Sequence, residues 1–507
     1  MALAFIASFV LWLLPCLPAT SHAQTLAYFR DSTFGAGLYD ARRLKKYGGP
    51  TVVDLDRDGY PDLLFNHHDS VPSQLFWNNG DGTFSRSSWQ MWHDIHGINA
   101  FPISPWTRNM RFTLSAGGNF GRNPSSPLMY EVNAATRNVR LVSAQAGVTR
   151  RGGRGRTAVY MDLSKRAHLY WPDVLFINAA ALKGSSQFAY EQTKSGRFTL
   201  RGVGGSFQST PEQLGTVTDL EDDLQMEVLT YWTLRVWRVT RAFTLTEISK
   251  QVLPRGLAYR GVAAVAELDF DNDGDFDLYV ARSRIGWWLP DVAYDDYLLE
   301  NRGGYYVDVS AKARIPRGTQ SRGVTTGDFN NDGFIDLHVT QYNDYDILLL
   351  NRGDGTFRRV SQPISRPGNT RGDHSVAFDY DMDGRIDIIS SQGDHNNVKL
   401  GGSYRLFQNI TPPSKKQRNY LLVRVGNPWN RSCTPLHAVV MVQAGKLRMK
   451  RRVGSPGTAV SNSYLETVHF GLGKRRRADR IFVKYSSGYV IVLKNVAAGR
   501  TVNIGWV

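Results

Sequence analysis

The sequence is poor in cysteine, and this limits the ways in which the chain can be stabilised. Only Cys16 and Cys433 occur among 507 residues. Cys16 lies in an apolar N-terminal stretch that we expect to be removed, which leaves Cys433 alone in the mature chain. A single cysteine excludes an internal disulfide, so packing and, by prediction, bound ions must hold the fold together.

Long apolar runs are also scarce. One such run covers residues 2–18, and it is followed by Ser21 and Ala23, small residues of the kind that signal peptidase requires. We therefore predict a signal peptide over residues 1–23, a mature chain that begins at Gln24, and a secreted, extracellular protein. The run has no Lys or Arg before it, so an uncleaved anchor is the alternative. No later segment is long and apolar enough to span a bilayer.

Familiar catalytic motifs are missing. The chain has no Gly-x-Ser-x-Gly, no His-Glu-x-x-His and no phosphate-binding loop of the Gly-x-x-x-x-Gly-Lys type. Patterns typical of RNA-recognition motifs, zinc fingers and helix-turn-helix domains are also lacking. These absences predict that the protein is not an enzyme and does not read nucleic acid sequence.

What the sequence has instead is one short acidic motif in four copies, which start at Asp54, Asp269, Asp328 and Asp379. Each copy has Asp or Asn at positions 1, 3 and 5, Gly at position 6 and Asp at position 9. Gly permits a sharp turn, and oxygens spaced two residues apart then converge on one point, as a calcium ion requires. An EF-hand would have Glu at position 12, where this chain has Phe65, Val280, Val339 and Ser390. The motifs therefore predict calcium-binding loops of another kind.

The acidic motifs belong to a longer repeat. Apolar, extended segments follow each motif, so we expect the acidic loops to join β-strands. The last intervals between motif starts are 59 and 51 residues, and the first gap of 215 is close to four such steps. The gap therefore predicts three degenerate repeats, near residue 108, at Asp162 and at Asp219. The last of these keeps its acids but has Leu224 in place of the turn Gly, so its calcium binding is left open.

A second periodic element identifies the architecture. Turns of the Asn-x-Gly type begin at Asn78, Asn301 and Asn351, between segments that read as strands, and such turns indicate hairpins. Units of about 54 residues with several short strands are typical of propeller blades. We predict an all-β fold, with a seven-bladed β-propeller over residues 24–415 followed by a small β-domain over residues 416–507.

The predicted C-terminal domain differs from the propeller in charge. Residues 401–507 contain 19 Lys or Arg and two acidic residues, whereas the preceding 400 residues contain 42 basic and 43 acidic ones. Such a concentration of positive charge favours association with a polyanion. The residues predicted to bind it are Lys446, Arg448, Lys450, Arg451, Arg452, Lys474, Arg475, Arg476 and Arg477.

These motifs resemble a known family. The acidic motif and the Asn-Arg-Gly-Asp-Gly-Thr-Phe turn at 351–357 resemble FG-GAP or VCBS repeats of integrin α-like propellers. The segments 464–465, 469–473 and 485–488 resemble the ASPIC/UnbV domain, which follows such repeats in cartilage acidic protein and in secreted bacterial proteins. In that family the loop acids hold calcium, together with a backbone carbonyl from position 7. The resemblance assigns to the metal Asp54, Asp56, Asp58, Tyr60 and Asp62; Asp269, Asp271, Asp273, Asp275 and Asp277; Asp328, Asn330, Asp332, Phe334 and Asp336; and Asp379, Asp381, Asp383, Arg385 and Asp387.

Taken together, the patterns predict a secreted, non-catalytic, calcium-binding propeller that acts in adhesion, matrix recognition or glycan recognition. The expected partners are an extracellular protein or an acidic glycan, with a polyanion at the C-terminal domain. Two alternatives stay open. One is a calcium-dependent polysaccharide lyase or hydrolase, and the other is a propeller lectin that stacks sugars on Trp77, Trp92, Trp287 or Trp288.

Overall fold

The computed structural model describes most of the chain between residues 27 and 505. The described ranges are 27–39, 48–67, 72–104, 106–117, 125–149, 153–166, 171–179, 186–283, 292–342, 344–360, 372–392, 403–412, 419–428, 434–458 and 460–505. The predicted signal peptide, Cys433 and the pair Trp287 and Trp288 lie outside them. Within the described ranges, no helix is long and apolar enough to cross a membrane.

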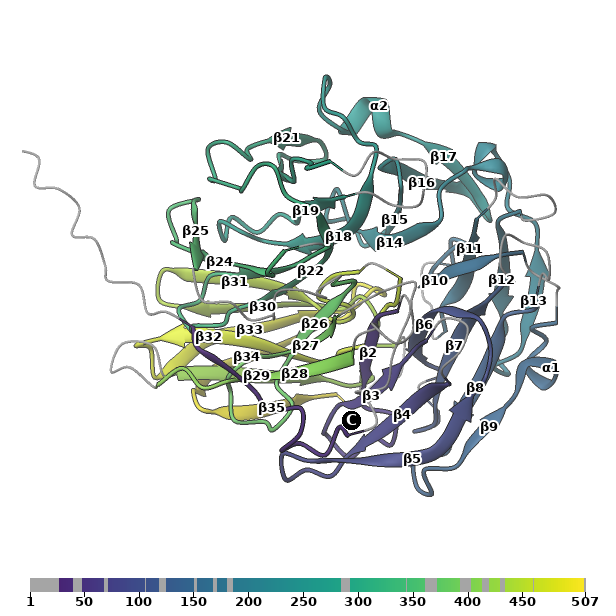
Figure 1. The fold of residues 1–507 in the computed structure, drawn as a ribbon, viewed down its shortest axis with the longest axis horizontal. Coiled ribbons are helices and arrows are strands. Elements are labelled where there is room, and N and C mark those ends of the chain that lie inside the picture. The colour runs from purple at the N-terminus through teal and green to yellow at the C-terminus, as the bar shows by residue number, and fades with distance from the viewer. Residues whose placement is uncertain are drawn as a thin grey trace, which may run out of the picture.

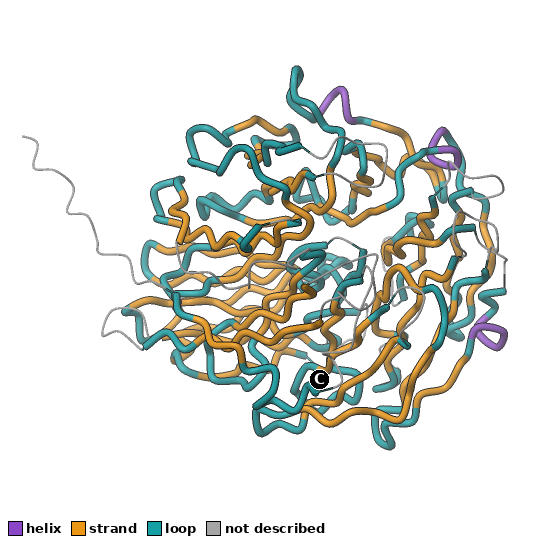
Figure 2. Tube along the Cα trace, viewed as in Figure 1, coloured by secondary structure: helices purple, strands orange, loops and turns teal. Residues whose placement is uncertain are grey.

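Most of the regular structure is antiparallel sheet, and helix is limited to single turns (Figure 2). In six of the sheets each strand pairs with its neighbours in the sequence, so these six are simple meanders. The first three are β2 (Pro50–Val53), β3 (Asp62–Phe65), β4 (Ser73–Asn78) and β5 (Phe84–Met91); β6 (Ile95–Pro102), β7 (Met110–Ala116), β8 (Leu128–Val132) and β9 (Val139–Leu141); and β10 (Gly155–Met161), β11 (Asp173–Asn178), β12 (Phe188–Gln192) and β13 (Phe198–Arg201).

The next three sheets repeat this arrangement. They are β14 (Leu214–Thr218), β15 (Glu227–Tyr231), β16 (Arg235–Arg241) and β17 (Thr244–Glu247); β18 (Val262–Leu268), β19 (Asp277–Arg282), β20 (Tyr297–Asn301) and β21 (Tyr306–Asp308); and β22 (Ser321–Gly327), β23 (Asp336–Gln341), β24 (Ile347–Asn351) and β25 (Phe357–Val360). The short helices α1 (Ser143–Ala146), η3 (Ser206–Ser209) and α2 (Ser249–Val252) lie in connections between strands or sheets.

The seventh sheet closes the ring. It contains β26 (Ser375–Phe378), β27 (Asp387–Gln392) and β28 (Ser403–Asn409), and its outermost strand is β1 (Phe29–Asp31) from the start of the described chain. The first strands β2, β6, β10, β14, β18, β22 and β26 contact one another in this order, and β26 contacts β2. Figure 1 shows the sheets arranged in chain order around a common centre. The propeller prediction is confirmed, and the ring of described residues contains seven four-stranded sheets.

The C-terminal residues form the predicted second β-domain. A three-stranded sheet has the order β32 (Thr467–Gly473), β29 (Asn419–Val425) and β35 (Arg500–Ile504), with β29 and β35 parallel. A four-stranded sheet has the order β31 (Leu447–Arg452), β30 (Val439–Ala444), β33 (Arg477–Lys484) and β34 (Val490–Ala497). Alternating apolar residues produce these strands, because one face of each sheet is buried in a shared core.

The C-terminal domain is anchored in the ring by one segment, residues 454–466. Its residues form isolated bridges with three first strands of the propeller, at Val53, Asn99 and Val265. The buried apolar side chains of the domain belong to the same core cluster as those of the first three sheets. Propeller and C-terminal domain are therefore packed as one body, which the sequence did not predict.

Candidate calcium sites and the domain interface

The four acidic motifs occupy equivalent places in four blades. The first acidic loop (residues 54–62) joins β2 to β3, the second (269–277) joins β18 to β19, the third (328–336) joins β22 to β23, and the fourth (379–387) joins β26 to β27. The position-6 glycines have φ angles of 106°, 100°, 98° and 84°, which residues with a side chain rarely adopt. This confirms the reason for Gly in the motif: the turn needs it.

Carboxylate oxygens converge in these loops as the motif spacing predicts. In the first, second and fourth loops, one oxygen from each of three carboxylates lies within 4.8 Å of the others. Two buried oxygens, Oδ2 of Asp269 and Oδ1 of Asp381, accept no hydrogen bond from any of the described residues. A buried carboxylate oxygen without a donor is costly unless a cation is near. The second and fourth loops therefore fit a hard cation.

Charge repulsion and burial act together on the acidic side chains. Burial raises the pKa of Asp269 to about 7. Burial, with Asp273 as the next cause, raises that of Asp271 to about 6. In the third loop, burial and the neighbouring Asp328 raise the pKa of Asp332 to about 8. A divalent cation would favour the ionised forms of all three, because it offsets both the lost solvation and the repulsion.

The acid at position 9 has a structural role that the sequence analysis missed. Both oxygens of Asp277 accept backbone N–H groups, one from Phe270 at 3.1 Å and one from Asn301 at 2.8 Å. Asp62, Asp336 and Asp387 accept the equivalent pair in their own blades. Position 9 therefore ties the loop to the end of the third strand, whether or not a metal is bound.

The same role explains what the degenerate repeats kept. Asp173 in the third blade accepts N–H groups from Leu163 and Gln192, and Glu227 in the fourth accepts the N–H of Leu220. Arg166 also pairs with Asp173 at 3.1 Å. The position-9 acid persists although the third blade has lost its middle acids and the fourth its turn Gly, because this acid holds the blade together.

The Asn that begins each predicted hairpin links adjacent blades, and so does Asn409 at the end of β28. The side chain of Asn351 donates to the carbonyl of Phe270, in the acidic loop of the preceding blade, at 2.7 Å. Asn78, Asn301 and Asn409 make the equivalent bond. Asn409 also lies in a glycosylation sequon, but its amide is buried and donates twice, so we expect no glycan there. The second sequon, at Asn430, lies outside the described residues.

The C-terminal domain lies against all four acidic loops. Lys450 Nζ donates to the carbonyl of Gly274 at 2.7 Å in the second loop, and the N–H of Gly473 donates to Asn331 at 2.9 Å in the third. His469 bonds the carbonyl of Gly384 in the fourth loop at 3.2 Å. In the first loop, Arg424 pairs with Asp54 at 2.5 Å. Each loop thus takes part in an interface with the C-terminal domain, while Asp58, Asp271 and Asp273 stay exposed.

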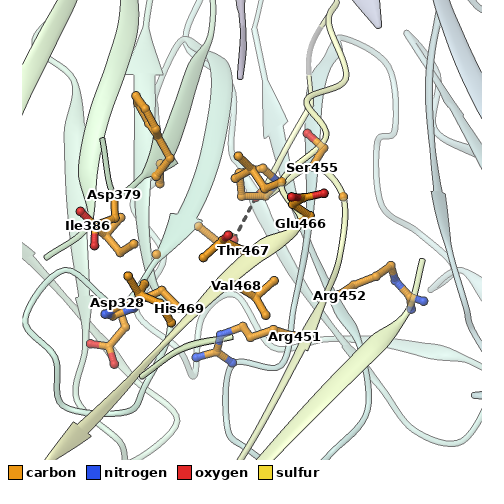
Figure 3. Close-up of a pocket in the computed structure, with 18 of the residues that line it drawn as sticks. Asp328, Asp379, Ile386, Arg451, Arg452, Ser455, Glu466, Thr467, Val468 and His469 are labelled. Carbon is orange, nitrogen blue, oxygen red and sulfur yellow. Dashed lines mark hydrogen bonds between the residues drawn. The ribbon is translucent and has the colours of Figure 1, made fainter. Parts of the chain in front are cut away.

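A cavity of about 110 Å³ lies within this interface. Asp54, Asp328 and Asp379, the position-1 acids of three loops, line it together with basic residues of β31. Figure 3 shows Asp328, Asp379 and His469 at one end, and Glu466 and Arg452 at the other. The cavity therefore connects three candidate metal loops beneath the C-terminal domain.

Three of the nine residues predicted to bind a polyanion are not available for this purpose. Lys450 is 3% exposed and pairs with Asp222 at 3.0 Å. Arg452 pairs with Glu267 at 2.7 Å, and Arg451 lies close to Asp269 and Asp328. The charged groups of these three side chains are buried at the interface with the propeller, so they do not lie on a surface that a polyanion can reach. The other six lie at the outer side of the domain, where Lys446, Arg448, Lys474, Arg476 and Arg477 are exposed and Arg475 is half-buried.

The two described tryptophans that the lectin alternative would use differ in solvent exposure. Trp77 is buried beneath the guanidinium of Arg137, so it has no face for a sugar. Trp92 is 67% exposed.

Comparisons with known proteins agree with the motifs. A model of the FG-GAP-like repeat matches residues 269–339 and 328–390, and a model described as ASPIC and UnbV matches residues 435–506. Human cartilage acidic protein 1 is 29% identical over 168 residues, which is 31% of this chain and 24% of that protein. The mouse protein is 27% identical over 168 residues, covering 31% of this chain and 25% of the mouse protein. The chain thus matches about a quarter of the length of these curated relatives.

Solved structures with a related fold are distant in sequence. A fungal alcohol oxidase in complex with copper is 11% identical, with a TM-score of 0.49 over 89% of this chain and 98% of that one. The BP39L lectin from Burkholderia pseudomallei is 10% identical, with a TM-score of 0.45 over 73% and 96%. The family models show that this chain carries FG-GAP-like repeats within its propeller, followed by an ASPIC and UnbV domain.

Proposed function

We propose that this protein is a secreted, calcium-binding propeller that acts without catalysis in adhesion or in matrix or glycan recognition. The observation that carries the proposal is the pair of donor-free, buried carboxylate oxygens on Asp269 and Asp381, in loops that match FG-GAP-like repeats. Calcium prefers six to eight oxygen ligands in flexible loops, and each of these two loops offers a buried carboxylate oxygen that no donor among the described residues occupies. Bound calcium would neutralise the negative charge of these buried carboxylates.

Calcium stoichiometry tests the proposal. Asp328→Ala and Asp379→Ala should each lower the number of bound calcium ions by one, because each removes the position-1 carboxylate of a loop. Asp162→Ala in the degenerate third blade is the matched control and should change nothing. Equilibrium dialysis followed by elemental analysis measures the number directly. A wild-type protein that retains no calcium at millimolar concentration would refute the proposal.

Calcium should also stabilise the fold, and more so at higher pH. A carboxyl group whose pKa is raised by folding stabilises the folded state at pH values below its pKa in the unfolded chain, which is about 4. This contribution to the free energy of unfolding is lost as the pH rises through the pKa of the folded state. For Asp271, Asp269 and Asp332 this loss begins near pH 4 and is complete only above the folded pKa values of about 6, 7 and 8. Sites with dissociation constants of about 0.1 to 1 mM contribute roughly 0.4 to 1.4 kcal/mol each at millimolar calcium.

Thermal melts at pH 6 and pH 8, with calcium and with excess chelator, measure this effect. We expect the chelated protein to melt at a lower temperature than the calcium form, with the larger gap at pH 8. Magnesium at the same concentration is the control, since it gives up its water less readily. An equal gap at both pH values would show that the acidic loops are not the origin of the stabilisation.

A second proposed activity is binding of a polyanion at the outer side of the C-terminal domain. Arg477 is 66% exposed, and the exposed Arg480 and Lys494 lie opposite one another on β33 and β34. These two residues extend the basic surface beyond the residues predicted from sequence. Acidic glycans suit such a surface, because their charges repeat along a chain.

Retention of the full chain on a heparin column tests this activity. Arg476→Ser with Arg477→Ser should elute at lower salt than wild type, because exposed charges interact over about 8 Å at physiological ionic strength. Arg140→Ser with Arg201→Ser, two exposed arginines of the propeller, is the matched control. Equal elution of both double variants would mean that the basic residues of the C-terminal domain face solvent and do not bind the polyanion.

A further inference from the structure

The first acidic loop differs from the others in the donors that its carboxylate oxygens accept hydrogen bonds from. Both oxygens of Asp54 accept loop N–H groups, and Oδ2 also accepts Arg424 at 2.5 Å. Oδ1 of Asp56 and Oδ1 of Asp58 accept the N–H groups of Asp58 and Tyr60. The second oxygen of each carboxylate, Oδ2, accepts a hydrogen bond from Arg137. Both oxygens of Asp62 accept backbone donors. Every carboxylate oxygen assigned to this site from sequence already has a protein donor.

Two guanidinium groups reach this loop from different parts of the molecule. Arg137 lies in the turn between β8 and β9 of the second blade, 2.5 Å from Asp56 and 3.3 Å from Asp58. Arg424 extends from β29 of the C-terminal domain to Asp54. Arginine stays charged at all relevant pH values and carries five donors in a planar fork. Two arginines therefore supply +2, the charge of one calcium ion.

Each arginine is held in place by a second contact. The Nε of Arg424 donates to Glu466 at 2.8 Å, and Glu466 also pairs with Arg57. The guanidinium of Arg137 lies over the ring of Trp77, 5.3 Å from its centre. Within the described residues, no arginine forms an ion pair or hydrogen bond with a carboxylate of the second or third loop: Arg451 lies near Asp269 and Asp328, but its only hydrogen bond there is to the carbonyl of Lys450. The arginine that pairs with the fourth loop, Arg385, belongs to the loop itself.

We infer that the first acidic loop takes the guanidinium groups of Arg137 and Arg424 in place of a metal ion. The loop then acts as a permanent clamp that joins the first blade, the second blade and the C-terminal domain. The sequence assignment of Asp54, Asp56, Asp58, Tyr60 and Asp62 to calcium does not fit this arrangement. The inference rests on the proposed function, because it states which of the four loops binds no ion.

The number of calcium ions bound by the full chain tests this inference. Wild type should bind three ions. Asp56→Asn should leave three, whereas Asp271→Asn, at the same position of the second loop, should leave two. The double variant Arg137→Gln with Arg424→Gln empties the first loop of guanidinium and should bind four. If the double variant does not fold, the single variant Arg137→Gln replaces it in this test, because the side chain of Arg137 is partly exposed. This single variant should gain a weak fourth calcium site.

The outcomes separate this inference from the proposed function. A wild type with four ions, reduced to three by Asp56→Asn, overturns the inference and leaves calcium binding intact. Arginine variants that fold and gain no ion also overturn it, because the loop would then be no cation site even when emptied. A wild type with no ions that gains one in the arginine variants supports the inference and refutes the proposed function.

Discussion

Tyr464→Ala is expected to lower the free energy of unfolding by about 3 to 5 kcal/mol, the range for removing a large buried aromatic side chain. Tyr464 is 1% exposed and lies in the segment that forms bridges with the first strands of three blades. Its backbone N–H donates to Val52 at 3.0 Å, and its side chain belongs to the core shared by both domains. The cavity left by alanine would therefore weaken propeller and C-terminal domain together.

Tyr464→Phe is the matched control for this substitution. The hydroxyl of Tyr464 is buried and has no hydrogen-bond partner among the described residues. Removing it should be nearly neutral or slightly stabilising, because an unsatisfied polar group is lost and the ring is kept. Urea unfolding monitored by tryptophan fluorescence and by circular dichroism measures both variants. If Tyr464→Ala unfolds at the same midpoint as Tyr464→Phe, the segment is not part of the core.

Glu466→Gln is expected to have an effect of similar size, about 3 to 5 kcal/mol, for an electrostatic reason. Glu466 is buried and accepts from two arginines, Arg57 of the propeller and Arg424 of the C-terminal domain. A neutral amide leaves both guanidinium groups in a buried site with less compensating charge. The loss should be greater than for ordinary surface pairs, which contribute about 0 to 1 kcal/mol.

Glu300→Gln provides the comparison, because Glu300 pairs at 2.9 Å with the exposed Arg302 within one blade. Urea is the suitable denaturant for both variants, since guanidinium chloride would screen the charges under test. We expect Glu300→Gln to fall within about 1 kcal/mol of wild type. Equal losses in the two variants would show that the pairs around Glu466 are no more important than surface pairs.

The sequence by itself determined the repeating unit and the place of each acidic loop within it. These features are local: a strand needs alternation over a few residues, and the loop needs Gly at position 6 because φ there is positive. Periodic spacing then located even the third blade, whose loop has lost its middle acids, and the fourth blade, whose loop has lost its turn Gly. The role of the position-9 acid was within reach too, since Asp173 and Glu227 persist in those blades.

Only the tertiary structure decided how the charges are used. Lys450, Arg451 and Arg452 look like any other basic run in the sequence, yet they face propeller acids that lie more than a hundred residues earlier. The first acidic loop matches the calcium motif as well as the others do, yet Arg137 and Arg424 reach it from another blade and another domain. Local patterns fix backbone geometry, but a charge is neutralised by whichever group the folded chain brings near it, and that pairing is not encoded in spacing along the sequence.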